Sequence, residues 1–338
     1  MSVTLREVAE KVGVTPSIVS RVLNDKPVRV SDDTRQRIIE VADELNYRPD
    51  LYARVLQSGK SPMVILVAPR SFYLMNARKT ARLQQTLRRT GHPLLTADIR
   101  LFDDPRAAID LLLLTKPRAI VWLSPEWGDD SEFEEICSEL HERETHVIAV
   151  DYQKQLPPDV PCDAITVDRA YGSYLACRHL IDCAGENVAM VGGSSGGRLQ
   201  GYRRALSERG IDREIIGWLS TAEPPREAYQ VTLGLLDDHP EIEGIFCYSD
   251  LNAMGVIKAI RETGRTIPDD ICIAGYDDEP WTEFHDPPLT TVTHPIEQLC
   301  SLSLSVLQDR LDGNDEPWCR IGLHPALKIR ASTAGREK

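Results

Sequence analysis

The sequence lacks the features of membrane and secreted proteins. It has no run of about 18 apolar residues that could cross a membrane, and its N-terminus has no apolar signal segment. We therefore expect a cytoplasmic protein with no membrane partner. Its 338 residues are enough for two or three compact units.

Cysteine pairs are missing too. None of the eight cysteines stands in a Cys-x-x-Cys pair, and most lie in apolar runs. This distribution is typical of buried thiols, not of zinc sites or disulfide frameworks. The sequence therefore predicts no metal site, and nothing in it indicates a cofactor.

The chain as a whole also lacks the positive charge expected of a protein that binds nucleic acid. Its net charge is −13, but residues 1–60 carry +1 and the remaining residues carry −14. Phosphates would repel such an acidic body. The N-terminal segment could still bind DNA if its basic side chains gather on one side, namely Arg21, Arg29, Arg48, Arg54 and Lys60.

Residues 4–24 predict two short helices joined by a tight turn. Thr4 and Glu7 have the spacing of a capping box, and Gly13 gives the backbone freedom that the turn needs. Pro16 fits the first position of the second helix, where no N–H donor is needed. Small polar side chains follow, as in a helix that enters the DNA major groove. An ordinary helical hairpin has the same spacing and is the alternative.

A third helix and a much shorter segment follow. Ser31 is placed to cap the third helix, which carries apolar residues on one face. Residues 50–59 give about two helical turns, which are too short to be stable alone because helix nucleation is costly. That segment needs a partner.

After Lys60, apolar runs of strand length alternate with amphipathic segments. This pattern predicts an α/β fold with parallel sheets, in which ligands bind at the carboxyl ends of the strands. The predicted strands are 63–68, 93–98, 119–124, 146–151, 164–168, 188–193, 244–249 and 271–277. The predicted helices include 76–90, 131–143, 170–183, 198–208 and 250–263.

The glycine-rich segment 192–197 raises the question of an enzyme. It matches the Gly-x-Ser-x-Gly nucleophile elbow with Ser195 as the nucleophile, and Asp277 and His294 follow in the order of an α/β-hydrolase. A hydrolase is therefore an alternative. The segment is not a phosphate-binding P-loop, because Arg and Leu follow it where Lys and Ser or Thr are needed. No set of glycines fits a dinucleotide-binding fingerprint.

Short motifs follow one another in a specific order through almost the whole chain. They are Thr4-Leu5, Glu7-Val8-Ala9, Gly13-Val14, Val19-Ser20-Arg21-Val22-Leu23-Asn24, Val30-Ser31, Leu45-Asn46-Tyr47, Asp168, Gly172, Gly192-Gly193, Gly201-Tyr202, Ala253-Met254-Gly255, Gly275-Tyr276-Asp277-Asp278 and Pro287-Pro288-Leu289-Thr290-Thr291. Their order and spacing resemble those of the lactose-repressor/galactose-repressor (LacI/GalR) family of transcription factors.

The resemblance implies an N-terminal all-α helix-turn-helix headpiece with a hinge helix, followed by a C-terminal α/β two-lobed, periplasmic-binding-protein-like core with parallel sheets. The implied boundaries are 1–49 for the DNA-binding domain, 50–61 for the hinge helix and linker, 62–161 plus 291–322 for the N-lobe, and 162–290 plus 323–338 for the C-lobe. The proline-rich residues 157–161 mark the expected division. The effector is expected in the cleft between the lobes.

The resemblance also implies which residues bind DNA. They are Thr4, Thr15, Pro16, Ser17, Ser20, Arg21, Asn24, Tyr47, Ala53 and Leu56. Arg21 is the expected guanine reader. Leu56 is expected to wedge into the minor groove, with packing between helix and core as its alternative role. Two departures from the family matter: Ile18 replaces a threonine that contacts phosphate, and Asp50 replaces an asparagine at the start of the hinge.

The implied effector-binding residues are Arg70, Phe72, Tyr73, Asp151, Arg198, Ser249, Asp250, Asp277 and His294. Carboxylates and an arginine suit a polyhydroxylated ligand. Helix capping or inter-strand hydrogen bonding is the alternative role of Asp250 and Asp277. Segment 70–76 departs most from the family. Its Arg70, beside Arg198, favours an acidic sugar or sugar phosphate, unless Arg70 points into solvent or forms a salt bridge.

The sequence thus predicts a transcriptional regulator, expected to be a repressor. It would bind double-stranded, pseudo-palindromic operator DNA as a homodimer and respond to a small-molecule effector of carbohydrate-like chemistry. Residues 329–338 lack apolar heptads, so no C-terminal tetramer bundle is expected. A ligand-binding protein without regulatory DNA binding is a further alternative.

Overall fold

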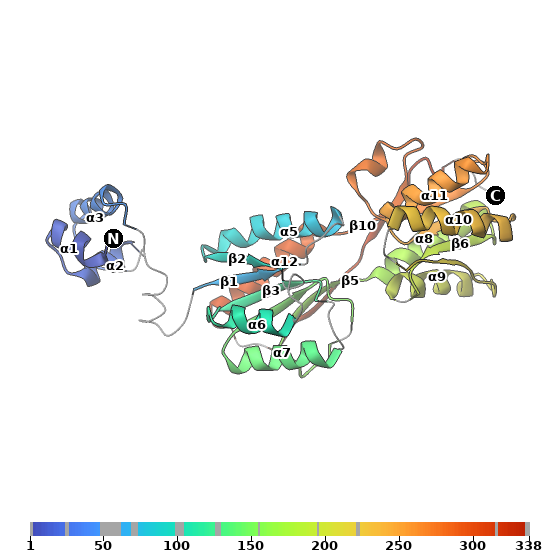
Figure 1. The fold of residues 1–338 in the computed structure, drawn as a ribbon. Coiled ribbons are helices and arrows are strands. Elements are labelled where there is room, and N and C mark those ends of the chain that lie inside the picture. The colour runs from blue at the N-terminus through green and yellow to red at the C-terminus, as the bar shows by residue number, and fades with distance from the viewer. Residues whose placement is uncertain are drawn as a thin grey trace. The chain divides into compact units, whose positions relative to one another are not determined.

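The computed structural model of the protein describes residues 3–23, 27–47, 62–68, 74–98, 105–125, 130–154, 156–194, 196–220, 224–314 and 317–334. The chain forms two compact units, residues 1–62 and residues 63–338 (Figure 1). Each unit has its own hydrophobic core.

The first unit is built from three helices, α1 (Leu5–Val12), α2 (Pro16–Leu23) and α3 (Asp32–Glu44). The predicted capping box is confirmed: the Thr4 hydroxyl accepts from the Glu7 amide at 3.4 Å, and the Glu7 carboxylate accepts from the Thr4 amide at 2.6 Å. Gly13 has a φ of 80°, which allows the turn into α2. The Ser31 hydroxyl caps α3 by accepting from the amide of Thr34.

One apolar face of each helix forms the core of this unit. Its buried residues are Val8, Ala9, Val19, Val22, Ile38, Val41 and Ala42. They recur at three- and four-residue spacings, so each helix turns one side inward. The polar faces of α1 and α2 are left exposed.

The second unit contains two six-stranded sheets. Sheet A has the strand order β11-β5-β4-β3-β1-β2, with all neighbours parallel. Its strands are β1 (Val64–Val67), β2 (Leu94–Ala97), β3 (Ala119–Leu123), β4 (His146–Val150), β5 (Asp163–Val167) and β11 (Arg320–Leu323). In Figure 1, α5 (Leu74–Leu87) and α12 (Ile296–Leu311) cover one face, and α6 (Pro105–Leu113) and α7 (Asp130–Glu142) cover the other. A 3-10 turn, η1 (Arg88–Thr90), follows α5.

Sheet B has the order β12-β10-β9-β8-β6-β7, and only β12 runs antiparallel to its neighbour. Its strands are β6 (Val188–Gly192), β7 (Ile215–Trp218), β8 (Gly244–Cys247), β9 (Cys272–Asp277), β10 (Thr290–Thr293) and β12 (Ala326–Lys328). α8 (Arg169–Ala184) and α9 (Gly197–Glu208) pack on one face. α10 (Pro224–Asp238) and α11 (Asp250–Glu262) pack on the other, and η3 (Pro280–Glu283) lies between β9 and β10.

Central strands explain the apolar runs of the sequence. β1, β3 and β6 are buried along their whole length, as expected of parallel strands covered by helices on both faces. Seven of the eight cysteines are buried free thiols, as predicted. The predicted fold class is confirmed. No helix within the described ranges combines the length and the apolar character needed to cross a membrane.

The predicted division between the lobes near residue 161 is wrong. β5 pairs with β4, with Asp163 opposite Ile148, so it is a strand of sheet A. The proline-rich residues 157–161 form a loop between neighbouring strands. The chain therefore first passes from the N-lobe to the C-lobe after Val167.

The second crossing lies three residues later than the predicted boundary at residue 290. β10 pairs with β9 and belongs to sheet B, so the chain returns to the N-lobe after Thr293. The third crossing falls between Leu323 of β11 and Ala326 of β12. Arg169 follows the first crossing strand, β5, and His294 follows the second, β10.

Two pairs of helices in the C-lobe approach each other closely because one helix has a glycine at the contact. A Cβ on Gly255 of α11 would lie 2.0 Å from the carbonyl oxygen of Pro225 in α10. A Cβ on Gly201 of α9 would lie 2.2 Å from the carbonyl oxygen of Ala170 in α8. No side chain fits at either position without a shift of backbone.

Candidate functional site

The second helix of the first unit exposes most of the residues predicted to contact DNA bases. Exposed residues are Thr15, Pro16, Ser17 and Arg21, and Ser20 is partly exposed. The Arg21 guanidinium donates to the carbonyl oxygen of Pro27 at 3.2 Å. This single exposed contact leaves most of the guanidinium donors available for a base edge.

The other residues predicted to bind DNA have different surroundings. Thr4 is exposed, and its hydroxyl takes part in the capping box of α1. Tyr47 is partly buried against the core of the first unit. Asn24, Ala53 and Leu56 lie outside the described residues, and so does the predicted hinge helix.

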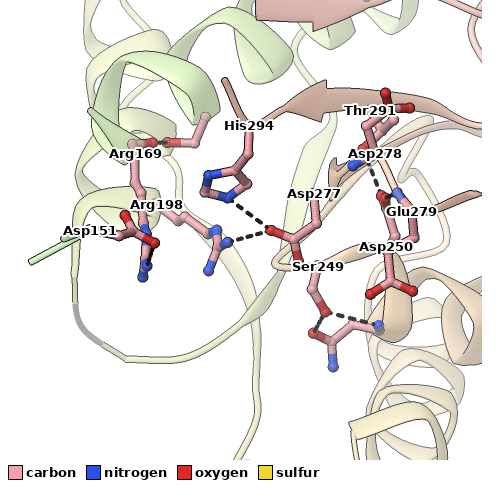
Figure 2. Close-up of polar contacts among 12 residues, drawn as sticks. Asp151, Arg169, Arg198, Ser249, Asp250, Asp277, Asp278, Glu279, Thr291 and His294 are labelled. Carbon is pink, nitrogen blue, oxygen red and sulfur yellow. Dashed lines mark hydrogen bonds and ion pairs between the residues drawn. The ribbon is translucent and has the colours of Figure 1, made fainter. Parts of the chain in front are cut away.

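A cluster of charged side chains lies at the carboxyl ends of strands of the second unit (Figure 2). Asp151 follows β4 and is fully buried. Its Oδ2 accepts hydrogen bonds from Lys79 Nζ and from Arg169 Nη2, the latter at 3.1 Å, and its Oδ1 accepts from Gln153 at 2.7 Å. Because Lys79 belongs to α5 and Arg169 begins α8, this carboxylate joins both lobes.

Asp277, at the end of β9, is the second carboxylate of the cluster. Its Oδ1 accepts from Arg198 Nη2 at 3.0 Å and from His294 Nε2 at 3.2 Å. The guanidinium of Arg198 lies 4.2 Å from the ring centre of Tyr276 and 4.5 Å from that of Tyr248. The two rings hold the guanidinium by cation–π contacts and fix its direction.

Burial and neighbouring charges shift the pKa values of these groups. Burial alone would raise the pKa of Asp151, but Lys79 and Arg169 hold it well below its ordinary value. Burial also raises the pKa of Asp277, but Arg198, the hydrogen bond from His294 and Lys79 together lower it below its ordinary value. Burial lowers the pKa of His294 to about 4. At pH 7 the cluster therefore holds two ionised carboxylates and a neutral imidazole.

Ser249 and Asp250, both predicted to contact the effector, make contacts within the C-lobe (Figure 2). The Ser249 hydroxyl caps α11 by accepting from the Asn252 amide at 3.2 Å. The buried Asp250 accepts from the Thr291 hydroxyl at 2.6 Å and from the Glu279 amide at 2.8 Å. Burial raises its pKa well above the ordinary value. These contacts match the alternative role predicted for Asp250, which is hydrogen bonding between strands.

Arg70, Phe72, Tyr73 and Ser195 lie outside the described residues. The predicted aromatic and basic floor of the cleft therefore stays a prediction, and so does the position of the nucleophile that a hydrolase would need.

Two residues of the cluster are missing from the sequence-based prediction, although each leaves a signal. Lys79 lies between Met75 and Leu83 on the buried face of α5 and is only 1% exposed. A lysine on an apolar stripe indicates a buried partner. Arg169 is the first residue of α8, where the helix dipole disfavours a cation. That position indicates an acidic partner outside the helix.

Four buried polar atoms at the strand ends have no hydrogen-bond partner within the described part of the chain. They are Ser124 Oγ, Arg198 Nε, Tyr276 Oη and His294 Nδ1. Buried polar groups are usually paired, so these atoms indicate capacity to bind a polar ligand. None of the described residues gather into a His, Cys, Asp and Glu group that could hold a metal ion.

Two family models match the chain. The model described as "Bacterial regulatory proteins, lacI family" matches residues 4–50, which include the three helices of the first unit. The model described as "Periplasmic binding protein-like domain" matches residues 177–333 of the second unit.

Relatives and a solved structure are similar over nearly the full length. The HTH-type transcriptional regulator DegA of Bacillus subtilis (strain 168) is 29% identical, with 99% of each chain covered. The HTH-type transcriptional repressor PurR of Mannheimia succiniciproducens is 27% identical, with 97% of this chain and 98% of PurR covered. The Lac repressor dimer, solved with operator and the anti-inducer ONPF, is 23% identical, covers 98% of this chain and 99% of its own, and has a TM-score of 0.83.

Proposed function

This chain is a transcriptional regulator of the LacI family, and on that premise we propose that it binds a pseudo-palindromic operator as a homodimer and is switched by a sugar or sugar derivative. The proposed sign of regulation is repression, which the similarity to PurR supports. The proposed effector site is the charged cluster around Asp151 and Asp277.

The exposed face of α2 supports the DNA-binding half of the proposal. It presents Ser17 and Arg21 on a helix whose opposite face is fixed in a core. One helix of eight residues buries too little surface for a specific site. Two DNA-binding units related by a two-fold axis match a two-fold operator. The similar Lac repressor was solved as a dimer on its operator.

The cluster of buried polar groups supports the effector half, and it is the observation that carries it. Ionised carboxylates, arginines and unpartnered atoms such as Tyr276 Oη and His294 Nδ1 can both accept and donate, as sugar hydroxyls require. Trp218 ends β7 at the same edge of sheet B and is 48% exposed. An aromatic face of this kind suits the apolar side of a sugar ring.

Like its relatives, the chain is a transcriptional regulator and not an enzyme. Asp277 and His294 do form the hydrogen bond that a hydrolase would use. However, Asp277 also accepts from Arg198, and an imidazole with a pKa near 4 is a weak general base. Ser195→Ala is expected to change no hydrolytic activity.

The test has two steps. Genomic sites bound by the full chain are mapped, and a ligand library is then screened by thermal shift and by release of the mapped operator. The proposal expects a palindromic site and at least one sugar-like compound that changes operator affinity. Binding of such a compound with no binding of residues 1–60 to duplex DNA would instead support a ligand-binding protein without a regulatory role.

A further inference from the structure

We propose that the effector is an acidic sugar whose single carboxylate binds between the guanidinium groups of Arg169 and Arg198. The inference rests on the proposed function, because it takes the charged cluster as the effector site. It adds the charge class of the ligand and the two residues that select it.

The geometry brings donors from separate elements to one place. Arg169 and Arg198 each use Nη2 to bind one carboxylate, Asp151 and Asp277 respectively (Figure 2). Both arginines lower the pKa of Tyr276 against the larger effect of its burial, so all three side chains lie within electrostatic reach of one another. Within the described residues, Arg198 Nε and Tyr276 Oη have no hydrogen-bond partner. A ligand carboxylate would accept from groups of this kind.

The basic side chains of the cluster outnumber the acids that bind them. Lys79 and Arg169 share Asp151, and Arg198 pairs with Asp277. Lys79 and Arg198 are only 1% and 7% exposed, so water screens the surplus positive charge poorly. An uncompensated buried charge is costly. A monoanionic ligand would balance this surplus, and a neutral sugar would leave it in place.

The acids around the cluster contact other groups. Asp250 accepts hydrogen bonds from the Thr291 hydroxyl and the Glu279 amide, and burial raises its pKa well above the ordinary value. Burial and the neighbouring Asp277 raise the pKa of Glu279, and Arg78 lowers it only in part. Asp278 forms an ion pair with Arg330 at 2.6 Å. The described contacts of Asp250 and Asp278 are thus with groups other than Lys79, Arg169 and Arg198.

The N-terminus of α9 adds to the positive potential. Its N-cap is Gly196, which offers no side chain to the first amides, and the first turn contains no acidic residue. The amides at a helix start and the positive end of the helix dipole favour an anion. Arg198 belongs to the same first turn of α9.

The experiment is isothermal titration of the full chain at pH 7.5 with matched acidic and neutral compounds. The acids are D-glucuronate, D-galacturonate and D-gluconate, and their partners are D-glucose, D-galactose and D-glucitol. At least one acid is expected to bind at least about tenfold more tightly than its neutral partner. Neutral compounds that bind as well as the acids, or three acids that do not bind, would overturn the proposal.

Variants assign the effect to the arginines. Arg169→Met is expected to reduce the affinity for the bound acid by at least about tenfold and to leave the affinity for the neutral partner within about twofold. Arg169→Lys, which keeps the charge, should recover part of the loss. Arg178→Met is the matched control, because Arg178 is an exposed arginine of the same helix that contacts Tyr174. Circular dichroism and thermal unfolding confirm that each variant is folded.

The failure of this inference can be told from the failure of the proposed function. A chain that binds its operator and is switched by a neutral sugar would keep the proposed function and refute the charge class. A chain that binds an acid but no duplex DNA would refute the proposed function and keep the site. If Arg169→Met loses the same factor of affinity for acidic and for neutral compounds, Arg169 only supports the fold of the cleft.

Discussion

Arg21 is the exposed cation of α2, and its guanidinium donates to the carbonyl oxygen of Pro27 at 3.2 Å. If it reads a guanine by a bidentate contact, Arg21→Ala should cost about 1–3 kcal/mol on the specific operator and relax selectivity at one base pair in each half-site. Fluorescence anisotropy on operator and on random duplex would measure both affinities.

The control for this prediction is Arg37→Ala, since Arg37 lies in α3 and pairs with the acidic side chains of Glu40 and Glu44. It should leave operator selectivity unchanged. If Arg21→Ala lowers the affinity for operator and for random duplex by the same factor, Arg21 contacts phosphate alone.

His294 should make the stability of the core depend on pH. Its pKa is about 4 in the fold against an ordinary 6.5, chiefly because of burial. The unfolded chain therefore binds more protons between these values, so the stabilising effect is complete above pH 6.5 and is lost as the pH falls toward 4. Between pH 7 and pH 5 the loss attributable to this group is about 2 kcal/mol.

Urea unfolding followed by tryptophan fluorescence at the two pH values measures this loss, with His294→Gln as the comparison. The variant should lose less stability than the parent on acidification. If the free energy of unfolding falls by the same amount between pH 7 and pH 5 in the parent and in the variant, His294 does not titrate in this window.

Single residues of the site could be predicted from sequence only where a motif marks them. Asp277 lies in a matching motif, and Arg198 lies three residues before another, Gly201-Tyr202; in the structure Arg198 Nη2 is 3.0 Å from Asp277 Oδ1. Lys79 stands in no motif, and a lysine in an amphipathic helix ordinarily lies in solvent. Its burial depends on Asp151, 72 residues away, and a pairing of that range has no local signature.

At the scale of elements, the contact between α10 and α11 depends on a glycine. Gly255→Ala would place a Cβ 2.0 Å from the Pro225 carbonyl oxygen, so the helices must separate. We expect a loss of about 1–3 kcal/mol in the free energy of unfolding. Gly234→Ala is the matched control, because Gly234 lies within α10 with no atom within 4 Å of its Cβ position.

The control should stabilise the protein by up to about 1 kcal/mol, since alanine favours helix more than glycine does. Thermal or urea unfolding of both variants gives the comparison. Equal effects of the two substitutions would mean that the contact between α10 and α11 tolerates a methyl group.

Elements with strong hydrophobic patterns were predictable, and their connections were not. The fully buried strands β1, β3 and β6 coincide with apolar runs. β5 was predicted as a strand but assigned to the wrong lobe, because prolines before it suggested a domain boundary. β12, with three residues and partly exposed, has too weak a pattern to stand out. Strand order depends on contacts between distant residues, which local periodicity does not contain.

At the scale of the whole molecule, the proposed dimer makes affinity depend on the spacing of the two half-sites. Inserting about 5 bp between them, half a helical turn, would place them on opposite faces of the duplex. Operator affinity should fall at least about a hundredfold toward that of a single half-site. Gel mobility shifts on the two duplexes measure this change, and an insertion of about 10 bp should restore part of the affinity.

A monomer that binds one half-site as tightly as the full operator would contradict the dimer model. Sedimentation velocity of the full chain, measured without DNA, provides the independent control, because a dimer should already be present at micromolar concentration.

The passage from β11 to β12 bears on how the protein is made. Residues 320–328 supply the edge strand of sheet A and, only two residues later, the edge strand of sheet B. Both sheets of a nascent chain therefore stay one strand short until the ribosome has passed residue 328. A premature stop codon before residue 320 would remove an edge from both sheets at once. Such a truncation would expose an unpaired strand edge in each sheet and would thus yield aggregation-prone products.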